Sequence, residues 1–438
     1  MKPISPHLLP DNAAIDESGN LSIAGVSLTT IAEQYGTPVF VYDEDHLRAR
    51  CHEAVTAFGR DSVIYASKAF LCTAMAKLVH DEGLLLDVAT GGELFVALHA
   101  GVPADHCVLH GNNKSVDELR MAMTAGVRHI VVDSFDELAR IESLVDEGLT
   151  APRVQLRITP GVYVHTHEYI STGQDDSKFG FNLGNGDARR AAGIAGASKK
   201  MRFVGIHCHI GSNVFAVENF THAARLMVDL ANELGVEEVT FGGGLGVAYV
   251  GDERAPSITD WSRHLLDAAS GLQKPTKVFV EPGRSIVASA AVTVYRVGTI
   301  KEIPGVRTYV SVDGGMSDNP RPVLYGSGMS DNPRPVLYGS GYEAFVPTRT
   351  NSARTKPVRV VGKHCESGDI LISETEVPAD LVVGDLLVTP VTGAYGHSMG
   401  SNYNKVTRPP VVFVRSGGAR LVVRRETFED LVRADVAE

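Results

Sequence analysis

The sequence predicts an α/β fold in which a (β/α)8 TIM barrel is followed by an all-β C-terminal domain. Between residues 60 and 285, eight short apolar runs alternate with segments of helical periodicity. Each run is apolar enough to be buried on both faces, as parallel strands are, and such units in succession are typical of a TIM barrel. Beyond residue 290 the chain is rich in β-branched residues separated by Gly, Pro and Asp turns, which indicates strands without intervening helices.

The expected elements follow from these patterns. Ser115 and Ser134 are each followed three residues later by a glutamate, a capping-box pattern that begins a helix. A chain of 438 residues is too long for one core. We therefore expect an N-terminal segment, 1–35, that packs with the β domain, then the barrel, 36–288, and the β domain, 289–438. The expected strands are 63–66, 84–88, 107–109, 129–132, 154–158, 203–206, 239–241 and 278–280 in the barrel, and 291–297, 307–312, 358–361, 381–389 and 411–414 beyond it.

Charge and composition argue against several classes of function. The net charge of −11 disfavours non-specific binding to nucleic acid or to an anionic membrane, which both need a positive field. The sequence has neither an N-terminal signal peptide nor the run of about eighteen apolar residues that a membrane span requires. Five cysteines without paired metal spacing are typical of reduced thiols. We expect a cytoplasmic protein.

Barrel chemistry is expected at the C-terminal ends of the strands. Lys68 follows the first strand, where a desolvated lysine can form a Schiff base with an aldehyde; an exposed surface lysine is the simpler alternative. The glycines 242–244 follow the seventh strand, where backbone amides can converge on a phosphate. A tight turn would explain the same three residues.

The sixth and eighth strands end in further reactive groups. In Glu281-Pro282-Gly283-Arg284, a carboxylate could keep a pyridine nitrogen protonated and an arginine could hold an anion, although a surface ion pair has the same sequence. His207 and His209 would share one face of the sixth strand if the strand extends that far. They could bind a metal, but no third ligand is evident. Core packing is the other alternative, and we favour His209 as a flat group that stacks on a planar cofactor.

Residues 315–327 are followed at once by an identical copy, residues 328–340. Repeat architectures use longer, diverged units, so a recent duplication, or an error in the recorded sequence, explains the pattern better. The two copies supply two equivalent arginines, Arg321 and Arg334, and two equivalent tyrosines, Tyr325 and Tyr338. We expect the first copy to be the working one, because it is joined directly to the strand at 307–312.

Four motifs, in this order on a barrel that precedes a β domain, resemble the fold-type III pyridoxal-phosphate decarboxylases. They are Y-A-S-K at 65–68, H-I-G-S at 209–212, G-G-G-L-G at 242–246 and E-P-G-R at 281–284. Later segments resemble the diaminopimelate decarboxylases within that group: the motif at 171–180, D-G-G-M at 313–316, R-P-x-L-Y-G, C-E-S-G-D at 365–369, G-A-Y-G at 393–396 and S-N-Y-N at 401–404. The similarity runs from about residue 35 to 415, and the tandem copy is the one clear departure.

This resemblance implies a role for each matching residue. Lys68 would carry pyridoxal 5'-phosphate covalently, and the residues around the cofactor would be His209, Ser212, Gly244, Glu281, Pro282, Gly283, Arg284 and Tyr395. The substrate would be held by Arg284, Glu366, Tyr395, and either Arg321 with Tyr325 or Arg334 with Tyr338. Cys365 would donate a proton to the reacting carbon. Cys365 and Glu366 would come from the partner subunit, so the resemblance implies a homodimer with shared sites.

The implied reaction removes one carboxyl group from meso-diaminopimelate, giving L-lysine and CO2 as the last step of lysine biosynthesis. Decarboxylases of ornithine, arginine or carboxynorspermidine share the cofactor site and are the nearest alternative. The far end of diaminopimelate is a second amino-acid centre, so it needs a cation and an acceptor together. A racemase is less favoured, because the electron sink with Glu281 favours loss of a carboxylate. A non-catalytic pyridoxal-phosphate carrier would lack the second domain.

Overall fold

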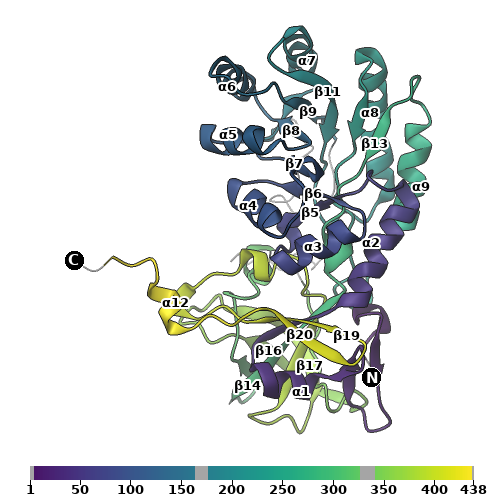
Figure 1. The fold of residues 1–438 in the computed structure, drawn as a ribbon. Coiled ribbons are helices and arrows are strands. Elements are labelled where there is room, and N and C mark those ends of the chain that lie inside the picture. Colours follow the sequence, from purple (N-terminus) through teal and green to yellow (C-terminus); the bar gives the residue numbers. More distant parts are fainter. Residues whose placement is uncertain (1–3, 163–175, 326–340, 437–438) are drawn as a thin grey trace. The chain divides into compact units, whose positions relative to one another are not determined.

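The computed structural model describes residues 4–162, 176–325 and 341–436 (Figure 1). The chain forms two compact units. The barrel unit consists of residues 50–246 and 255–285, and the β unit consists of residues 1–49, 247–254 and 286–438. Across these described ranges, every helix is too short or too polar to cross a membrane.

The barrel unit contains eight parallel strands whose order in the sheet follows the chain. Val63 pairs with Val280, and the Ile64 amide donates to the Val280 carbonyl at 2.8 Å, so the first and last strands meet and the barrel closes. This confirms the predicted TIM barrel. Its strands are β5 (Ile64–Ala66), β6 (Leu85–Val88), β7 (Cys107–Leu109), β8 (His129–Val132), β9 (Arg153–Thr159), β11 (Arg202–Cys208), β12 (Glu238–Thr240) and β13 (Lys277–Phe279), and the two-residue β10 (Phe181–Asn182) pairs with β9.

Apolar side chains from five of these strands pack together inside the barrel. They are Ile64, Leu85, Val108, Val131 and Phe279, each at most 1% exposed. Helices lie around the outside of the strands (Figure 1). They are α3 (Thr73–Asp81), α4 (Gly91–His99), α5 (Val116–Ala125), α6 (Phe135–Asp146), α7 (Asp187–Ala197), α8 (Val217–Leu234) and α9 (Ile258–Ala269).

The two predicted capping boxes have different outcomes. At α5 the box is complete, because Ser115 and Glu118 each accept from the other's backbone amide. At α6 the Ser134 hydroxyl accepts from the Glu137 amide, but the Glu137 carboxylate turns elsewhere. It lies 2.7 Å from the buried Lys114 ammonium, which explains why the second box is only half formed.

The β unit is built on one mixed sheet in the order β17-β16-β15-β14-β4-β19-β20, with β18 paired to β14. These strands are β4 (Val39–Asp43), β14 (Ala291–Ile303), β15 (Arg307–Val312), β16 (Arg354–Val361), β17 (Ile370–Pro378), β18 (Leu386–Pro390), β19 (Val411–Arg415) and β20 (Gly418–Val423). A small N-terminal sheet precedes them, made of β1 (Ala13–Ile15), β2 (Leu21–Ile23) and β3 (Val26–Ser27), followed by α1 (Leu28–Tyr35). The other helices are α2 (Glu44–Phe58), α10 (Arg284–Val287), α11 (Arg321–Tyr325) and α12 (Phe428–Val432).

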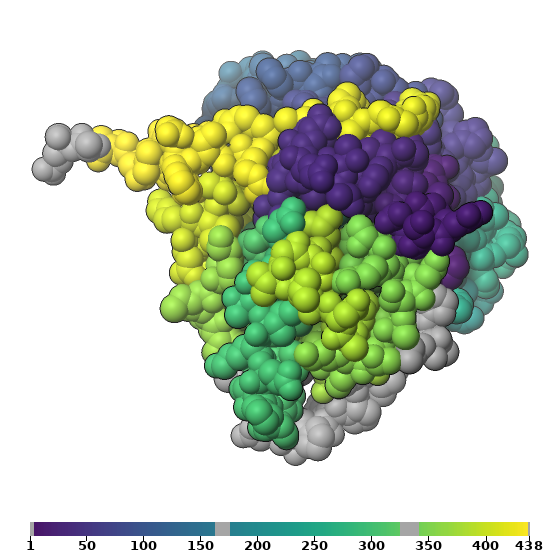
Figure 2. Space-filling view, turned by 90° about the horizontal axis from the view of Figure 1, so that it is seen from below, coloured from purple at the N-terminus to yellow at the C-terminus, as the bar shows by residue number. Residues whose placement is uncertain are grey.

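Strand β4 differs from the expectation, because residues 36–288 were expected to form the barrel. Val39–Asp43 is buried throughout and lies between β14 and β19, parallel to β19. The N-terminal residues accordingly lie beside the C-terminal strands, purple against yellow in Figure 2. Two further strands, β17 and β20, were not expected. Both have several exposed positions and lack a long apolar run. The expected strand 381–389 begins only at Leu386.

Candidate active site

A buried carboxylate with two histidines lies inside the barrel unit. Glu281 follows β13, His110 follows β7 and His207 lies on β11. One Glu281 oxygen, Oε2, is hydrogen-bonded to His207 Nε2 at 2.9 Å, and the other, Oε1, lies 3.0 Å from His110 Nε2. The three side chains are at most 8% exposed. All three residues lie near the C-terminal ends of barrel strands, where the active sites of TIM barrels are found.

The pKa shifts in this cluster follow from its neighbours. Burial alone would raise the pKa of Glu281, but the interactions with His207 and His110 bring that pKa well below its usual value. Burial lowers the pKa of His110, yet Asp87 and Glu281 outweigh it and raise that pKa overall. Burial lowers the pKa of His207, and Glu281 only partly offsets this. Glu281 is therefore an anion at neutral pH.

Lys68 and His209 are electrostatic neighbours of this cluster. Lys68 follows β5 in the short turn Ser67–Ala69 and is exposed. Burial, and then the charges of Lys68 and Arg157, lower the pKa of His209 well below its usual value. Its Nδ1 accepts from the Gly243 amide at 3.3 Å, which only an unprotonated nitrogen can do. The His209 ring is thus neutral, with its half-buried ring next to the glycine loop.

The loop after β12 brings backbone close to the end of β13. Gly244 has φ +109°, and a Cβ there would lie 2.1 Å from the Gly211 carbonyl oxygen. A Cβ on Gly243 would lie 1.9 Å from the Glu281 carbonyl oxygen, so only glycine fits at either position. Arg284 donates to the Ser212 hydroxyl at 3.0 Å. The arginine, the hydroxyl and the bare glycine backbone are the donor types that bind a phosphate.

In the β unit, Cys365 and Glu366 lie on an exposed loop that contacts the segment containing Tyr403 and Asn404. The Cys365 amide donates to the Asn404 side chain at 2.9 Å, and the Tyr403 hydroxyl lies 3.5 Å from Glu366 Oε2. Tyr395 has φ +63°, a strained conformation for a bulky residue and one that is often associated with functional sites. The motifs 365–369 and 401–404 are therefore in contact.

Asp369 anchors the same loop from inside the β unit. Its carboxylate accepts from the His364 amide at 2.8 Å and from the Met316 amide at 2.7 Å, and it lies 2.9 Å from His364 Nδ1. The His364 ring is stacked on Tyr403, with an interplanar angle of 3°. Sequence reasoning gave no role to His364 or Asp369, although Asp369 closes the C-E-S-G-D motif.

Part of the first copy of the tandem segment is buried in the β unit: residues 317–319 and 321 are buried, whereas Val323 and Leu324 are exposed. Arg321, at the start of α11, is 6% exposed, and its guanidinium lies 3.4 Å from the ring centroid of Tyr249 and 5.2 Å from that of Tyr342. The side chain of Tyr325 and the residues Arg334 and Tyr338 lie outside the described part of the chain. The structure therefore describes one of the two candidate arginines.

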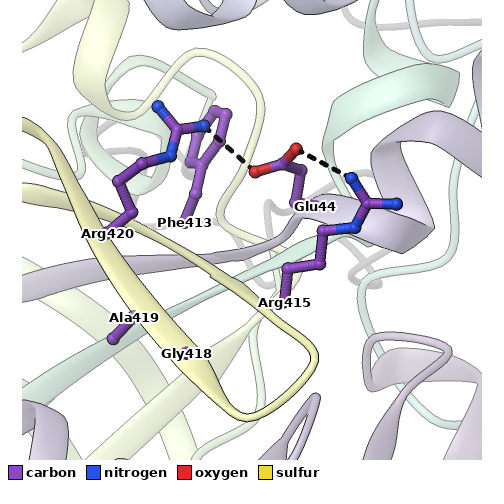
Figure 3. Close-up of a pocket in the computed structure, with 6 residues that line it drawn as sticks. All are labelled: Glu44, Phe413, Arg415, Gly418, Ala419 and Arg420. Carbon is purple, nitrogen blue, oxygen red and sulfur yellow. Dashed lines mark hydrogen bonds and ion pairs between the residues drawn. The ribbon is translucent and has the colours of Figure 1, made fainter.

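A cavity of about 360 Å³ in the β unit contains none of the predicted site residues (Figure 3). Its charged groups already pair with one another. Glu44 lies 3.0 Å from Arg420 and 3.7 Å from Arg415, and the dashed lines in Figure 3 mark these two contacts. This cavity is accordingly not a candidate for the active site.

Comparisons with known proteins identify the family of this chain. A family model described as "Pyridoxal-dependent decarboxylase, pyridoxal binding domain" matches residues 44–288. Diaminopimelate decarboxylases from Mycobacterium tuberculosis and Bacillus subtilis are 45% and 44% identical to this chain, covering 99% and 96% of it and 98% and 96% of their own lengths. The chain belongs to the pyridoxal-dependent decarboxylases.

Solved structures of this decarboxylase family have the same fold. A diaminopimelate decarboxylase from M. jannaschii, crystallised with L-lysine, has a TM-score of 0.87 and 32% identity, and the match covers 98% of both chains. A lysine/ornithine decarboxylase from Vibrio vulnificus, at 22% identity and a TM-score of 0.73, shares the fold. The comparisons therefore support the family that the sequence motifs indicated.

The cofactor of this decarboxylase family fits the residues of the barrel unit. Pyridoxal phosphate needs an amine for its aldehyde, an acceptor for its ring nitrogen and donors for its phosphate. Lys68, the ionised Glu281, and the glycine loop with Ser212 and Arg284 supply these three. The sequence alone left a metal pair of His207 and His209 open. Among the described residues, His207 groups instead with His110 and Glu281, whose possible ligand atoms lie within 4.8 Å of one another.

Proposed function

We propose that this chain is a pyridoxal-phosphate-dependent decarboxylase that converts meso-diaminopimelate to L-lysine and CO2. The observation that carries the proposal is the anionic Glu281, fixed on both oxygens by histidines, with Lys68 and the glycine loop as neighbours. An anion there keeps a pyridine nitrogen protonated. The substrate is inferred from the names of the relatives, which match this chain over nearly its whole length.

The residues of the barrel unit would bind and orient the cofactor. When bound, pyridoxal phosphate supplies a ring that takes up the electron pair left by the departing CO2. Lys68 would hold the aldehyde carbon, and the neutral His209 would stack on the ring without adding a competing positive charge. Gly244, Ser212 and Arg284 would bind the phosphate. Pro282 and Gly283 would keep this loop close to β5, where a Cβ on Gly283 would lie 2.9 Å from that of Ala66.

The residues of the β unit would bind the substrate and deliver the proton. Tyr395 would contact both cofactor and substrate. Arg321, or Arg334 in its place, would bind the distal carboxylate, with Tyr325 or Tyr338 beside it. Glu366 would accept from the distal ammonium. The Cys365 thiol would then protonate the carbon from which CO2 has left.

We infer that the protein works as a homodimer in which Cys365 and Glu366 complete the partner's site. Both side chains are exposed in the single chain, as expected for groups that face a second subunit. The Cys365 amide donates to Asn404, and the Tyr403 hydroxyl lies against Glu366. Mixing inactive Lys68→Ala and Cys365→Ala proteins should restore part of the activity, because exchange creates one intact site. Subunit exchange without recovered activity would refute the shared site.

We also propose that the protein works in the cytoplasm. The five cysteines form no disulfide, and Cys365 is exposed. An exposed catalytic thiol needs a reducing compartment to stay unoxidised. Expression with compartment markers would test this, and recovery of the protein outside the cytoplasm would contradict it.

The substrate is tested by CO2 release from a panel of amino acids. The purified protein, supplied with pyridoxal phosphate, should release CO2 from meso-diaminopimelate with L-lysine as the only other product. Ornithine, arginine and carboxynorspermidine should be poor substrates, because each lacks a distal amino-acid centre. Faster release from any of these three would replace the proposed substrate and leave the reaction class intact.

A further inference from the structure

The two histidines at Glu281 make unequal contacts. His207 Nε2 is in hydrogen-bond geometry with Oε2, whereas its Nδ1 is buried and has no hydrogen-bond partner among the described residues. A second proton on Nδ1 would leave a buried N–H unsatisfied, so His207 is neutral and donates from Nε2. His110 Nε2 lies 3.0 Å from Oε1 but outside hydrogen-bond geometry, and the two histidine rings meet edge to face with centroids 5.0 Å apart.

The electrostatic surroundings of His110 include a second buried acid besides Glu281. Asp87, on β6, is 4% exposed and is the largest of the charges that raise the pKa of His110. Lys68 opposes a positive charge on His110, and Arg157 opposes one on His207. At His110, Asp87 and Glu281 together outweigh burial and Lys68, so both carboxylates favour the protonated form of the ring.

We propose that His110 and His207 are positioning residues with different tasks: His207 fixes the Glu281 carboxylate as a neutral donor, and His110 keeps it ionised as a cation. Each carboxylate oxygen retains a second lone pair, so Glu281 can still accept from the ring nitrogen of the cofactor. The inference rests on the proposed function, because it assigns these residues to the electron sink of that reaction. Neither histidine would touch the substrate.

The same substitution at the two positions separates the two tasks. Glutamine places a neutral N–H donor near the position of Nε2, so His207→Gln should keep wild-type cofactor affinity within about twofold. His110→Gln removes the positive charge and should weaken pyridoxal-phosphate binding about tenfold, the range for one charge-assisted contact. Its visible absorbance should shift toward that of Glu281→Gln. His207→Leu, which removes the donor, should behave like His110→Gln.

A double-mutant comparison separates positioning from general packing. In a Glu281→Gln background, neither His110→Gln nor His207→Leu should weaken cofactor binding or change the absorbance further, because there is no carboxylate left to hold. Circular dichroism confirms that each protein is folded, and the glutamine variants serve if the leucine variant is not. These readouts need no substrate, so they are independent of the reaction itself.

Three results would overturn the inference. One is equal behaviour of His110→Gln and His207→Gln, and another is an undiminished effect of either variant in the Glu281→Gln background. The third is a stoichiometric metal ion in the wild-type protein that is lost in His110→Gln, which would make the cluster a metal site. A wild-type protein that binds no pyridoxal phosphate would overturn the proposed function as well, whereas normal binding with unaffected variants removes the inference alone.

Discussion

Two buried carboxyl groups, one in each unit, have pKa values shifted in opposite directions. Glu281 in the barrel unit lies against two histidines, and its pKa is well below the usual value. Asp318 in the β unit is 2% exposed and accepts from the Tyr295 hydroxyl at 2.7 Å and the Gly315 amide at 2.8 Å. Burial, reinforced by Asp369 and Asp313, raises the pKa of Asp318 to about 7 despite these bonds.

This difference shows that burial alone does not set the charge of a carboxyl group. Both groups lose water, and that loss favours the neutral acid in each case. The interactions with His207 and His110 reverse the preference at Glu281, whereas neutral donors and further acids leave it in place at Asp318. We therefore assign the charged Glu281 of the barrel unit to the reaction. Asp318 of the β unit instead packs against the segment at Gly315. The following predictions test this division of roles.

The largest effect is expected in the barrel unit. Lys68→Ala should lower the rate of CO2 release at least about 10⁴-fold, the upper end for loss of a single catalytic group, and should abolish covalent attachment of the cofactor. Lys77→Ala removes an exposed lysine on α3 whose ion pair is with Asp81, and it should leave the rate unchanged. Equal rates in the two variants would refute the role of Lys68.

A substitution in the β unit should leave cofactor binding unchanged. Cys365→Ala should lower kcat about 10²- to 10⁴-fold, because the carbon loses its proton donor, while the visible absorbance of the bound cofactor and its affinity stay those of the wild type. Ser367→Ala, in the same exposed loop, should change neither quantity. A changed absorbance in Cys365→Ala would contradict the separation of roles between the two units.

The tandem copies give a third, smaller effect. Arg321 packs against Tyr249 and Tyr342, so Arg321→Ala should raise KM for diaminopimelate strongly and lower the melting temperature. Arg334→Ala should leave both quantities close to wild type. A larger KM effect at Arg334 would assign the substrate to the second copy, and equal effects would refute a single working copy.

The smallest effect concerns stability and pH. The pKa of Asp318 is higher in the folded state, about 7, than its ordinary value of 3.8, so its proton stabilises the fold fully below about pH 4. That contribution falls as the pH rises toward 7, by up to about 1.4 kcal/mol per pH unit. Asp318→Asn, which mimics the neutral acid, should gain melting temperature relative to wild type as the pH rises from 4 to 8. Asp136→Asn, at an exposed site, should follow the wild type throughout.

The barrel was predictable because its strands are buried on both faces. Lys68, His209 and Glu281 follow the C-terminal ends of strands, where the active site of a TIM barrel is expected. The contacts of His110 and His207 with Glu281 were not predictable from the sequence. The three residues are far apart in the chain, and only barrel closure brings them together. Strand β4 was assigned to the wrong unit for a similar reason. Its five buried residues look like a barrel strand until the pairing with β14 and β19 is known.

The β unit was harder to predict in detail. Strand β20 is mostly exposed and gives no alternating signal. The interaction of Asp369 with Met316 and His364 joins residues from two separate motifs, and no local pattern indicates it. The roles of Cys365, Glu366, Tyr395 and the two arginines rest on the family resemblance and stay predictions.

The attachment of the cofactor tests the central claim most directly. The protein is incubated with pyridoxal phosphate, reduced with borohydride, digested and mapped by mass spectrometry. The account predicts one reduced pyridoxyl group per chain, on the peptide that contains Lys68, and none on that peptide in Lys68→Ala. A label on another lysine, or an unlabelled protein that still releases CO2 from meso-diaminopimelate, would contradict it.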